Sequence, residues 1–131
     1  MYAERLGLPR ALGLNPFAAM TAAGIVLALG SDSPVTPLDP WGSVRAAVRH
    51  RTPGSGVEPA AAFDAHTRGG WRAAKRDADG VVTAGAPATF AVWAPGELDP
   101  ATGLPALGPD DDPPACLRTV ARGTVIHDAL G

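Results

Sequence analysis

The sequence predicts an α/β segment followed by a smaller, mostly β segment. Before residue 79, helical stretches flank one continuous apolar run, residues 25–29, whose lack of alternation is typical of a strand buried on both faces. After residue 80, short β-branched or aromatic runs alternate with clusters of Gly, Pro and Asp. We therefore expect two domains, residues 1–78 and residues 79–131.

Composition narrows the possible classes of function. Hydrophobic residues make up 46% and charged residues 18% of the 131 positions, which is too apolar for intrinsic disorder. The formal net charge of −2 gives no basic surface for nucleic acid. The single cysteine, Cys116, excludes an intrachain disulfide and a multi-cysteine metal site, and it fits a cytoplasmic protein.

The first well-defined elements surround the apolar run. Asn15 and Pro16 are typical of a helix start, so we expect a helix over residues 17–23 that ends at Gly24. A buried strand over residues 25–29 follows. The whole apolar stretch is too short for a membrane span, which needs roughly 20 residues, and we expect no membrane contact. A secretion signal cleaved after Gly30 is an alternative reading of the same stretch.

Two further helices are expected before the β segment. One covers residues 40–50, with Asp39 as its N-cap and its apolar residues on one face. The other begins at Pro59 and ends near the glycine pair 69–70. A loop over residues 51–56 separates them, and a charged turn follows the second.

The β segment contains four candidate strands and one long loop. The β-branched and aromatic runs that predict the strands are residues 81–82, 89–93, 117–120 and 124–126. The loop, residues 94–114, carries three consecutive aspartates from Asp110 to Asp112. They lack the alternating oxygen ligands of a calcium loop, so we expect a solvated face there.

Asp32 is the candidate functional residue. It follows the carboxyl end of the predicted strand, where α/β barrels and open parallel sheets place their reactive groups. A carboxylate there can bind a divalent metal and accept a proton from metal-bound water. The alternative is that residues 31–34 form only a turn, since Ser, Asp and Pro are common turn residues.

A series of motifs in chain order resembles the amidohydrolase superfamily, and most closely the branch often called YtcJ-like or amidohydrolase family 3. The central match is Gly-Ser-Asp-Ser-Pro-Val over residues 30–35, followed by Asp39-Pro40-Trp41. Flanking matches are Arg5-Leu6-Gly7, Asn15-Pro16-Phe17, Ala-His-Thr-Arg-Gly-Gly over residues 65–70, Gly-Ala-Pro-Ala-Thr-Phe-Ala-Val-Trp over residues 85–93, and the final run over residues 119–127.

This resemblance implies the C-terminal end of a TIM-barrel metal-dependent hydrolase, with the last barrel strand and helices, followed by part of a small β-sandwich domain. It also implies hydrolysis of carbon–nitrogen bonds in a small-molecule substrate, with one or two divalent metals, commonly zinc. Asp32 matches the family's aspartate on the eighth strand, which binds metal or the attacking water and relays its proton. The loop over residues 51–56 is expected to border the substrate in a complete barrel.

The same resemblance shows what the sequence lacks. Family enzymes take further ligands from a His-x-His pair and from Lys, Glu and His residues on earlier strands, and those segments are absent here. His50, His66 and His127 have no metal-ligand spacing, so we expect structural roles for them. A separate N-terminal chain would have to complete the barrel. Without it the exposed strand favours association with a second copy, and a non-catalytic remnant or a small interaction protein is the alternative function.

Overall fold

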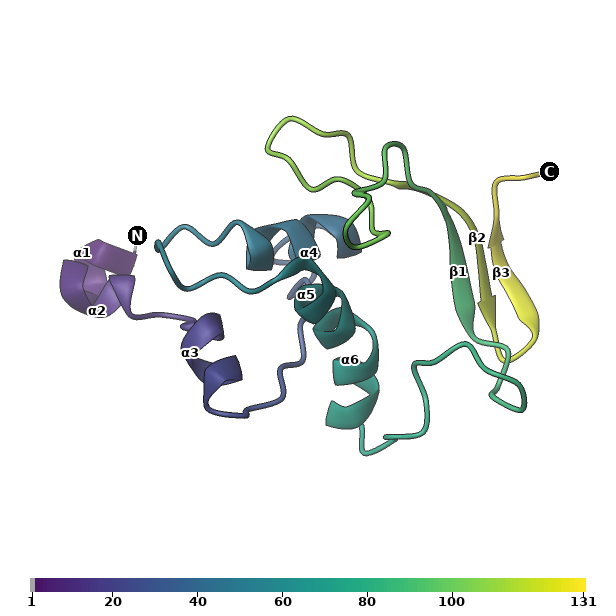
Figure 1. Cartoon of the computed structure of the whole chain (residues 1–131), viewed down its shortest axis with the longest axis horizontal. Coiled ribbons are helices and arrows are strands. Elements are labelled where there is room, and N and C mark those ends of the chain that lie inside the picture. Colours follow the sequence, from purple (N-terminus) through teal and green to yellow (C-terminus); the bar gives the residue numbers. More distant parts are fainter. Residues whose placement is uncertain (1) are drawn as a thin grey trace.

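The computed structural model describes residues 2–131, and within them six helices precede three strands (Figure 1). The helices are α1 (Tyr2–Leu6), α2 (Leu8–Leu12), α3 (Phe17–Ala22), α4 (Pro40–Val48), α5 (Pro59–His66) and α6 (Arg68–Ala73). The strands are β1 (Phe90–Ala94), β2 (Ala115–Ala121) and β3 (Thr124–Asp128). The helices lie at one end of the molecule and the sheet at the other. The predicted β character of the second part is confirmed, whereas the first part, predicted as α/β, contains helices and no strand among its described residues. The division into two domains stays a prediction.

The core lies where α4 packs against α5. On α4, Trp41, Val44 and Ala47 are at most 7% exposed, and Ala62 of α5 is fully buried against them. The alanines allow the two helices to approach closely, but each buries little area, so the aromatic rings supply much of the apolar contact.

Trp41 also connects the helices to the sheet. Its ring stacks on that of Phe63 with centroids 5.6 Å apart, and it meets the ring of Trp93 edge-on at 6.0 Å. Phe63 belongs to α5 and Trp93 to β1. A single indole therefore contacts both parts of the chain.

Three of the predicted helices form, with local differences at their ends. Helix α3 begins and ends within one residue of its predicted bounds, but the side chain of Asn15 does not cap it. Asn15 has φ 52°, and its carbonyl oxygen accepts a hydrogen bond from the N–H of Phe17 at 2.8 Å. The helix predicted from Pro59 to residues 69–70 is interrupted at Thr67, where α5 ends and α6 begins.

The prediction of a strand over residues 25–29 is wrong for this structure. The segment has no strand partner, and Ile25 and Val26 are 50% and 55% exposed. The N–H and C=O groups of residues 26–28 form no hydrogen bond within residues 2–131. A parallel strand needs a neighbour for its peptide groups, and the remaining strands of this chain pair among themselves instead.

The segment is held in place by contacts with α5 and α6. The N–H of Leu29 donates to the carbonyl oxygen of Ala65 at 3.0 Å. Gly69 of α6 lies directly against the carbonyl group of Leu27, so close that a β-carbon at position 69 would overlap that oxygen. Gly70, its neighbour, has open space around it.

This pair of glycines gives a matched test of the contact. Gly69→Ala is expected to lower the free energy of unfolding by about 1–3 kcal/mol, because the backbone of Leu27 must shift. Gly70→Ala is expected to raise it by roughly 0.5–1 kcal/mol, because alanine is the better helix former and meets nothing. Urea denaturation followed by circular dichroism measures both. An equal change in the free energy of unfolding for the two variants would show that residues 25–29 do not contact α6.

The sheet is antiparallel in the order β1-β2-β3, with bulges between Val92 and Trp93 and between Thr119 and Val120. Three of the four predicted strands are confirmed. The fourth, residues 81–82, is wrong: Val82 is 89% exposed and lies outside the sheet. Between β2 and β3, Nη2 of Arg118 donates to Oδ2 of Asp128 at 2.8 Å, and this hydrogen bond lowers the pKa of the Asp128 carboxyl.

Candidate functional site

Asp32 lies in a tight turn immediately after the apolar segment. Its backbone is left-handed, with φ 58°, a conformation that Asp adopts more readily than most residues. Its carbonyl oxygen accepts a hydrogen bond from the N–H of Val35 at 2.9 Å, and the hydroxyl of Thr36 donates to the carbonyl oxygen of Ser31. Residues 31–34 therefore form a turn on which Asp32 is exposed, and the role of Asp32 as a metal ligand stays a prediction.

The carboxylate of Asp32 is exposed and makes no hydrogen bond or ion pair within residues 2–131. In the same range, no three His, Cys, Asp or Glu side chains come together in a group that could hold a metal ion. Structural zinc has four protein ligands and catalytic zinc commonly three. The residues of this chain alone therefore do not fit a zinc ion.

Each histidine contacts a different part of the structure. Nδ1 of His50 accepts a hydrogen bond from the N–H of Thr52 at 3.0 Å, and its ring meets Phe17 edge-on at 5.5 Å. His66 ends α5, and its Nε2 is buried without a partner. Nε2 of His127, on β3, lies 3.2 Å from the carbonyl oxygen of Cys116. None of them joins Asp32 in a ligand group within the described chain.

A pocket of about 470 Å³ lies beside the turn, between α4 and the N-terminal helices. The end of the apolar segment, Leu29 to Ser31, forms part of its wall. Its polar lining includes Asn15, His50 and Arg51. The guanidinium of Arg51 has no hydrogen-bond or ion-pair partner among residues 2–131, so it is free to meet an anionic group.

Sequence reasoning only partly anticipated this pocket. The loop over residues 51–56 was expected to border a substrate, and its first residue, Arg51, lines the pocket. The contributions of Asn15 and the N-terminal helices were missed. They come from residues far from position 32 in the sequence, and their polar side chains follow no spacing pattern that would have linked them to it.

Asp39 has the role of helix cap that the sequence predicted. Its Oδ1 accepts a hydrogen bond from the N–H of Gly42 at 2.8 Å, at the start of α4. Asp39→Ala is expected to lower the free energy of unfolding by about 0.5–2 kcal/mol, and Asp39→Asn by much less, since asparagine also caps helices well. Thermal and urea denaturation measure the difference. A loss of equal size in both variants would mean that the negative charge, and not the hydrogen bond, stabilises α4.

Two other candidate groups have structural contacts. The acidic triplet is exposed, as the sequence predicts, and it also makes local contacts: a carboxylate oxygen of Asp111 accepts from the N–H of Gly108 at 2.5 Å, and Arg45 donates to the carbonyl oxygen of Asp111 at 2.8 Å. Sγ of Cys116 lies 3.4 Å from the hydroxyl of Thr119, a contact that activates neither group as a nucleophile.

No described helix has both the length and the apolar character that crossing a membrane requires.

Comparison with known proteins gives one match. No curated protein and no solved structure matches the sequence. Residues 1–127, nearly the whole chain, match the family model described as the amidohydrolase family, in its third branch. With a helical part, a three-stranded antiparallel sheet and a family match of this extent, the chain belongs to the amidohydrolase family.

Proposed function

We propose that this chain is the C-terminal part of a metal-dependent amidohydrolase that hydrolyses non-peptide carbon–nitrogen bonds in a small-molecule substrate. The observation that carries the proposal is the family match over residues 1–127, within which Asp32 lies at the end of the apolar segment. In this proposal Asp32 is a ligand of a divalent metal, zinc, and accepts a proton during hydrolysis. The site lies in the cytoplasm and contacts neither nucleic acid nor membrane.

The active site must draw its remaining groups from elsewhere. Asp32 is a single carboxylate, and it belongs to no group of three or more possible metal ligands in the described chain. The unpaired peptide groups of residues 26–28 favour a partner that supplies neighbouring strands. We propose that a separate N-terminal chain completes the barrel, with residues 25–29 as its last strand and residues 79–131 as part of the small β domain. The chain alone is then inactive.

The pocket beside the turn supports this assignment. It adjoins Gly30 and Ser31, directly before Asp32, and Arg51 offers an unpaired positive charge at its wall. A substrate with a carboxylate or other anionic group would meet Arg51 while its reacting bond lay toward Asp32. The role of the chain's own residues is thus to bind and orient the substrate and to hold a proton at the Asp32 carboxylate.

The decisive experiment measures metal content and hydrolysis for three samples: the chain alone, the product of the adjacent gene, and their mixture. Mass spectrometry of the eluted metal and a panel of N-acyl and cyclic amide substrates provide the readouts. Stoichiometric zinc and hydrolysis in the mixture only are the expected result. If the chain alone binds zinc and turns over substrate, or if the mixture does neither, the split-enzyme proposal is wrong.

A second candidate function is a non-catalytic interaction protein, or a remnant, that associates through an exposed strand. The observation that favours it is β3, which is exposed along its whole length, with Ile126 65% exposed at the edge of the sheet. Free strand edges with apolar side chains pair readily with a second copy. Light scattering of the purified chain separates the candidates: a stable homodimer that does not exchange with the adjacent gene's product favours this second function.

A further inference from the structure

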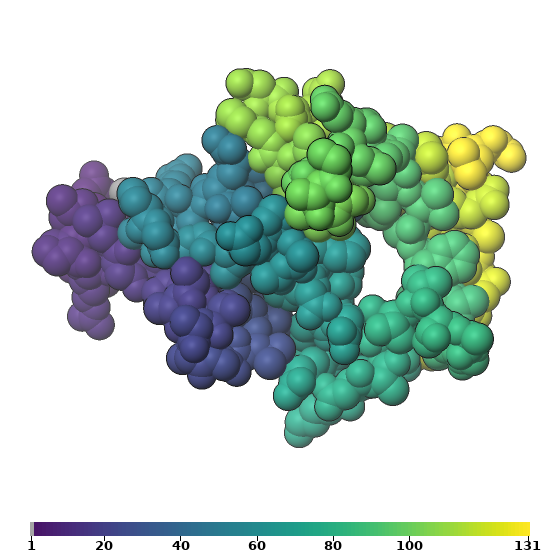
Figure 2. Space-filling model, in the orientation of Figure 1, coloured from purple at the N-terminus to yellow at the C-terminus, as the bar shows by residue number. Residues whose placement is uncertain are grey.

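A large apolar cavity lies between the helices and the sheet, away from Asp32. Its volume is about 750 Å³, within the range of ~300–1,000 Å³ that small-molecule sites occupy. Figure 2 shows an opening there, bordered by the teal helical segment and the green segments that follow it. Six aromatic residues contribute to its wall: Trp41, Phe63, His66, Trp71, Phe90 and Trp93.

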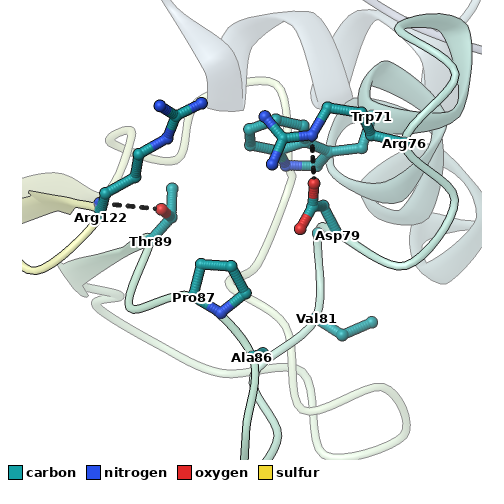
Figure 3. A pocket seen from close by; sticks show the side chains of 9 residues that line it. Trp71, Arg76, Asp79, Val81, Ala86, Pro87, Thr89 and Arg122 are labelled. Carbon is teal, nitrogen blue, oxygen red and sulfur yellow. Dashed lines mark hydrogen bonds and ion pairs between the residues drawn. The ribbon is translucent and has the colours of Figure 1, made fainter.

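On the helical side, the ring of Trp71 is fixed as a wall of the cavity. The guanidinium of Arg76 lies over it, 4.7 Å from the ring centroid, and is itself held by an ion pair with Asp79 at 2.5 Å (Figure 3). Gly80 lies so close to the edge of the ring that a β-carbon there would stand 2.6 Å from Cδ1. The same residues line the small pocket drawn in Figure 3, which has room for about one water molecule.

On the opposite side, an ordered loop borders the cavity. Leu98 and Pro105 form an isolated antiparallel bridge, and the N–H of Asp99 donates to the carbonyl oxygen of Leu104 at 2.9 Å. Leu98, Leu104 and Pro105 line the cavity. The stacked rings of Trp41 and Phe63 also belong to its wall. The site is therefore an open, aromatic-lined gap between the helices and the sheet (Figure 2).

The chemistry of the wall selects the ligand. No Asp, Glu, Lys or Arg lines the cavity within residues 2–131, so a charged ligand would lose its hydration without gaining a counter-ion. Flat aromatic molecules can stack on the indole and phenyl faces. Within residues 2–131, Nε1 of Trp41 and Nε2 of His66 lack a hydrogen-bond partner, but protein atoms cover both nitrogens, so neither is exposed at the cavity surface. The cavity therefore offers a ligand aromatic faces and no charged group of the described residues.

We propose that this cavity binds a neutral, planar aromatic compound. The site stands apart from Asp32 and does not depend on the hydrolase function. Its ligand stacks on the tryptophan rings that line the cavity.

The three tryptophans give a direct readout, because the chain has three and all of them line this cavity. Titration of the whole chain with N-phenyl-1-naphthylamine, a neutral dye that accepts energy from tryptophan, should saturate at one dye per chain. Tryptophan emission should fall as sensitised dye emission rises. The sulfonated analogue 8-anilino-1-naphthalenesulfonate has the same rings and a negative charge, and it should bind roughly tenfold more weakly or worse.

Two variants of β1 provide the structural control. Ala91 lines the cavity, whereas Val92, the next residue, does not. Ala91→Phe should weaken saturable dye binding by placing a ring inside the site, and Val92→Phe should leave it unchanged. Both substitutions place a good strand former in a strand, and circular dichroism verifies folding. Equal binding by the two dyes, several dyes per chain, or equal loss in both variants would overturn the proposal, since each result describes a general apolar surface.

Discussion

Asp32→Asn is expected to reduce hydrolysis by the mixture of the two chains by about 10²–10⁴-fold, the usual contribution of a positioned acid–base group. Asparagine tolerates the left-handed backbone at φ 58° and keeps the size of the side chain, but it cannot hold the proton. The loss should appear in kcat, and the zinc content of the mixture should fall with it. Steady-state kinetics and metal analysis measure the two effects on the same samples.

This test separates an effect on catalysis from an effect on stability. Asp32 is exposed, and its carboxylate contributes no hydrogen bond or ion pair to the fold of residues 2–131. Asp32→Asn should therefore leave the unfolding transition unchanged. Ser33→Ala, in the same turn, is the matched control and should keep full activity. Retained activity in Asp32→Asn would leave residues 31–34 as a turn with no part in the reaction.

The second large effect is on stability. Trp41→Ala is expected to lower the free energy of unfolding by about 3–5 kcal/mol, because Trp41 is 7% exposed and its ring contacts both Phe63 and Trp93. Domains of ordinary stability have only ~5–15 kcal/mol in total, and the buried core here is small. The variant should be largely unfolded near body temperature.

Urea denaturation followed by far-ultraviolet circular dichroism measures this loss. Val82→Ala is the control, since Val82 is 89% exposed, and its effect should stay within about 0.5 kcal/mol. A Trp41→Ala variant as stable as this control would mean that the helices and the sheet are each held together without the Trp41 contacts.

The sequence best predicted those elements whose formation depends on residues close together in the chain. Asp39 and Pro40 begin a helix wherever they occur together before an apolar face, and α4 begins there. The β-branched runs that become β2 and β3 pair with each other across a connection of only two residues. The glycine pair did not predict the split between α5 and α6, which occurs earlier, at Thr67, where φ −108° and ψ −86° depart from helical values.

The errors and omissions have a shared physical cause, which is dependence on distant partners. Residues 25–29 have the composition of a buried strand, but pairing requires neighbours that the described chain does not offer. Asp32 could be assigned from its place after that run and from family resemblance, whereas the pocket beside it combines Asn15 with Arg51. The aromatic cavity likewise gathers Trp41 and Trp93, whose spacing along the chain follows no helical or strand period.

The order of the sheet has a consequence for how the chain is made. Strands β1, β2 and β3 lie side by side in the order of their synthesis, and the last two are joined by Arg122 and Gly123, both with positive φ, as in a tight two-residue hairpin. Pairings between sequence neighbours close short loops and form quickly. On the ribosome the helices are complete before β1 exists, so Trp41 lacks its contact with Trp93 until β1 has been synthesised.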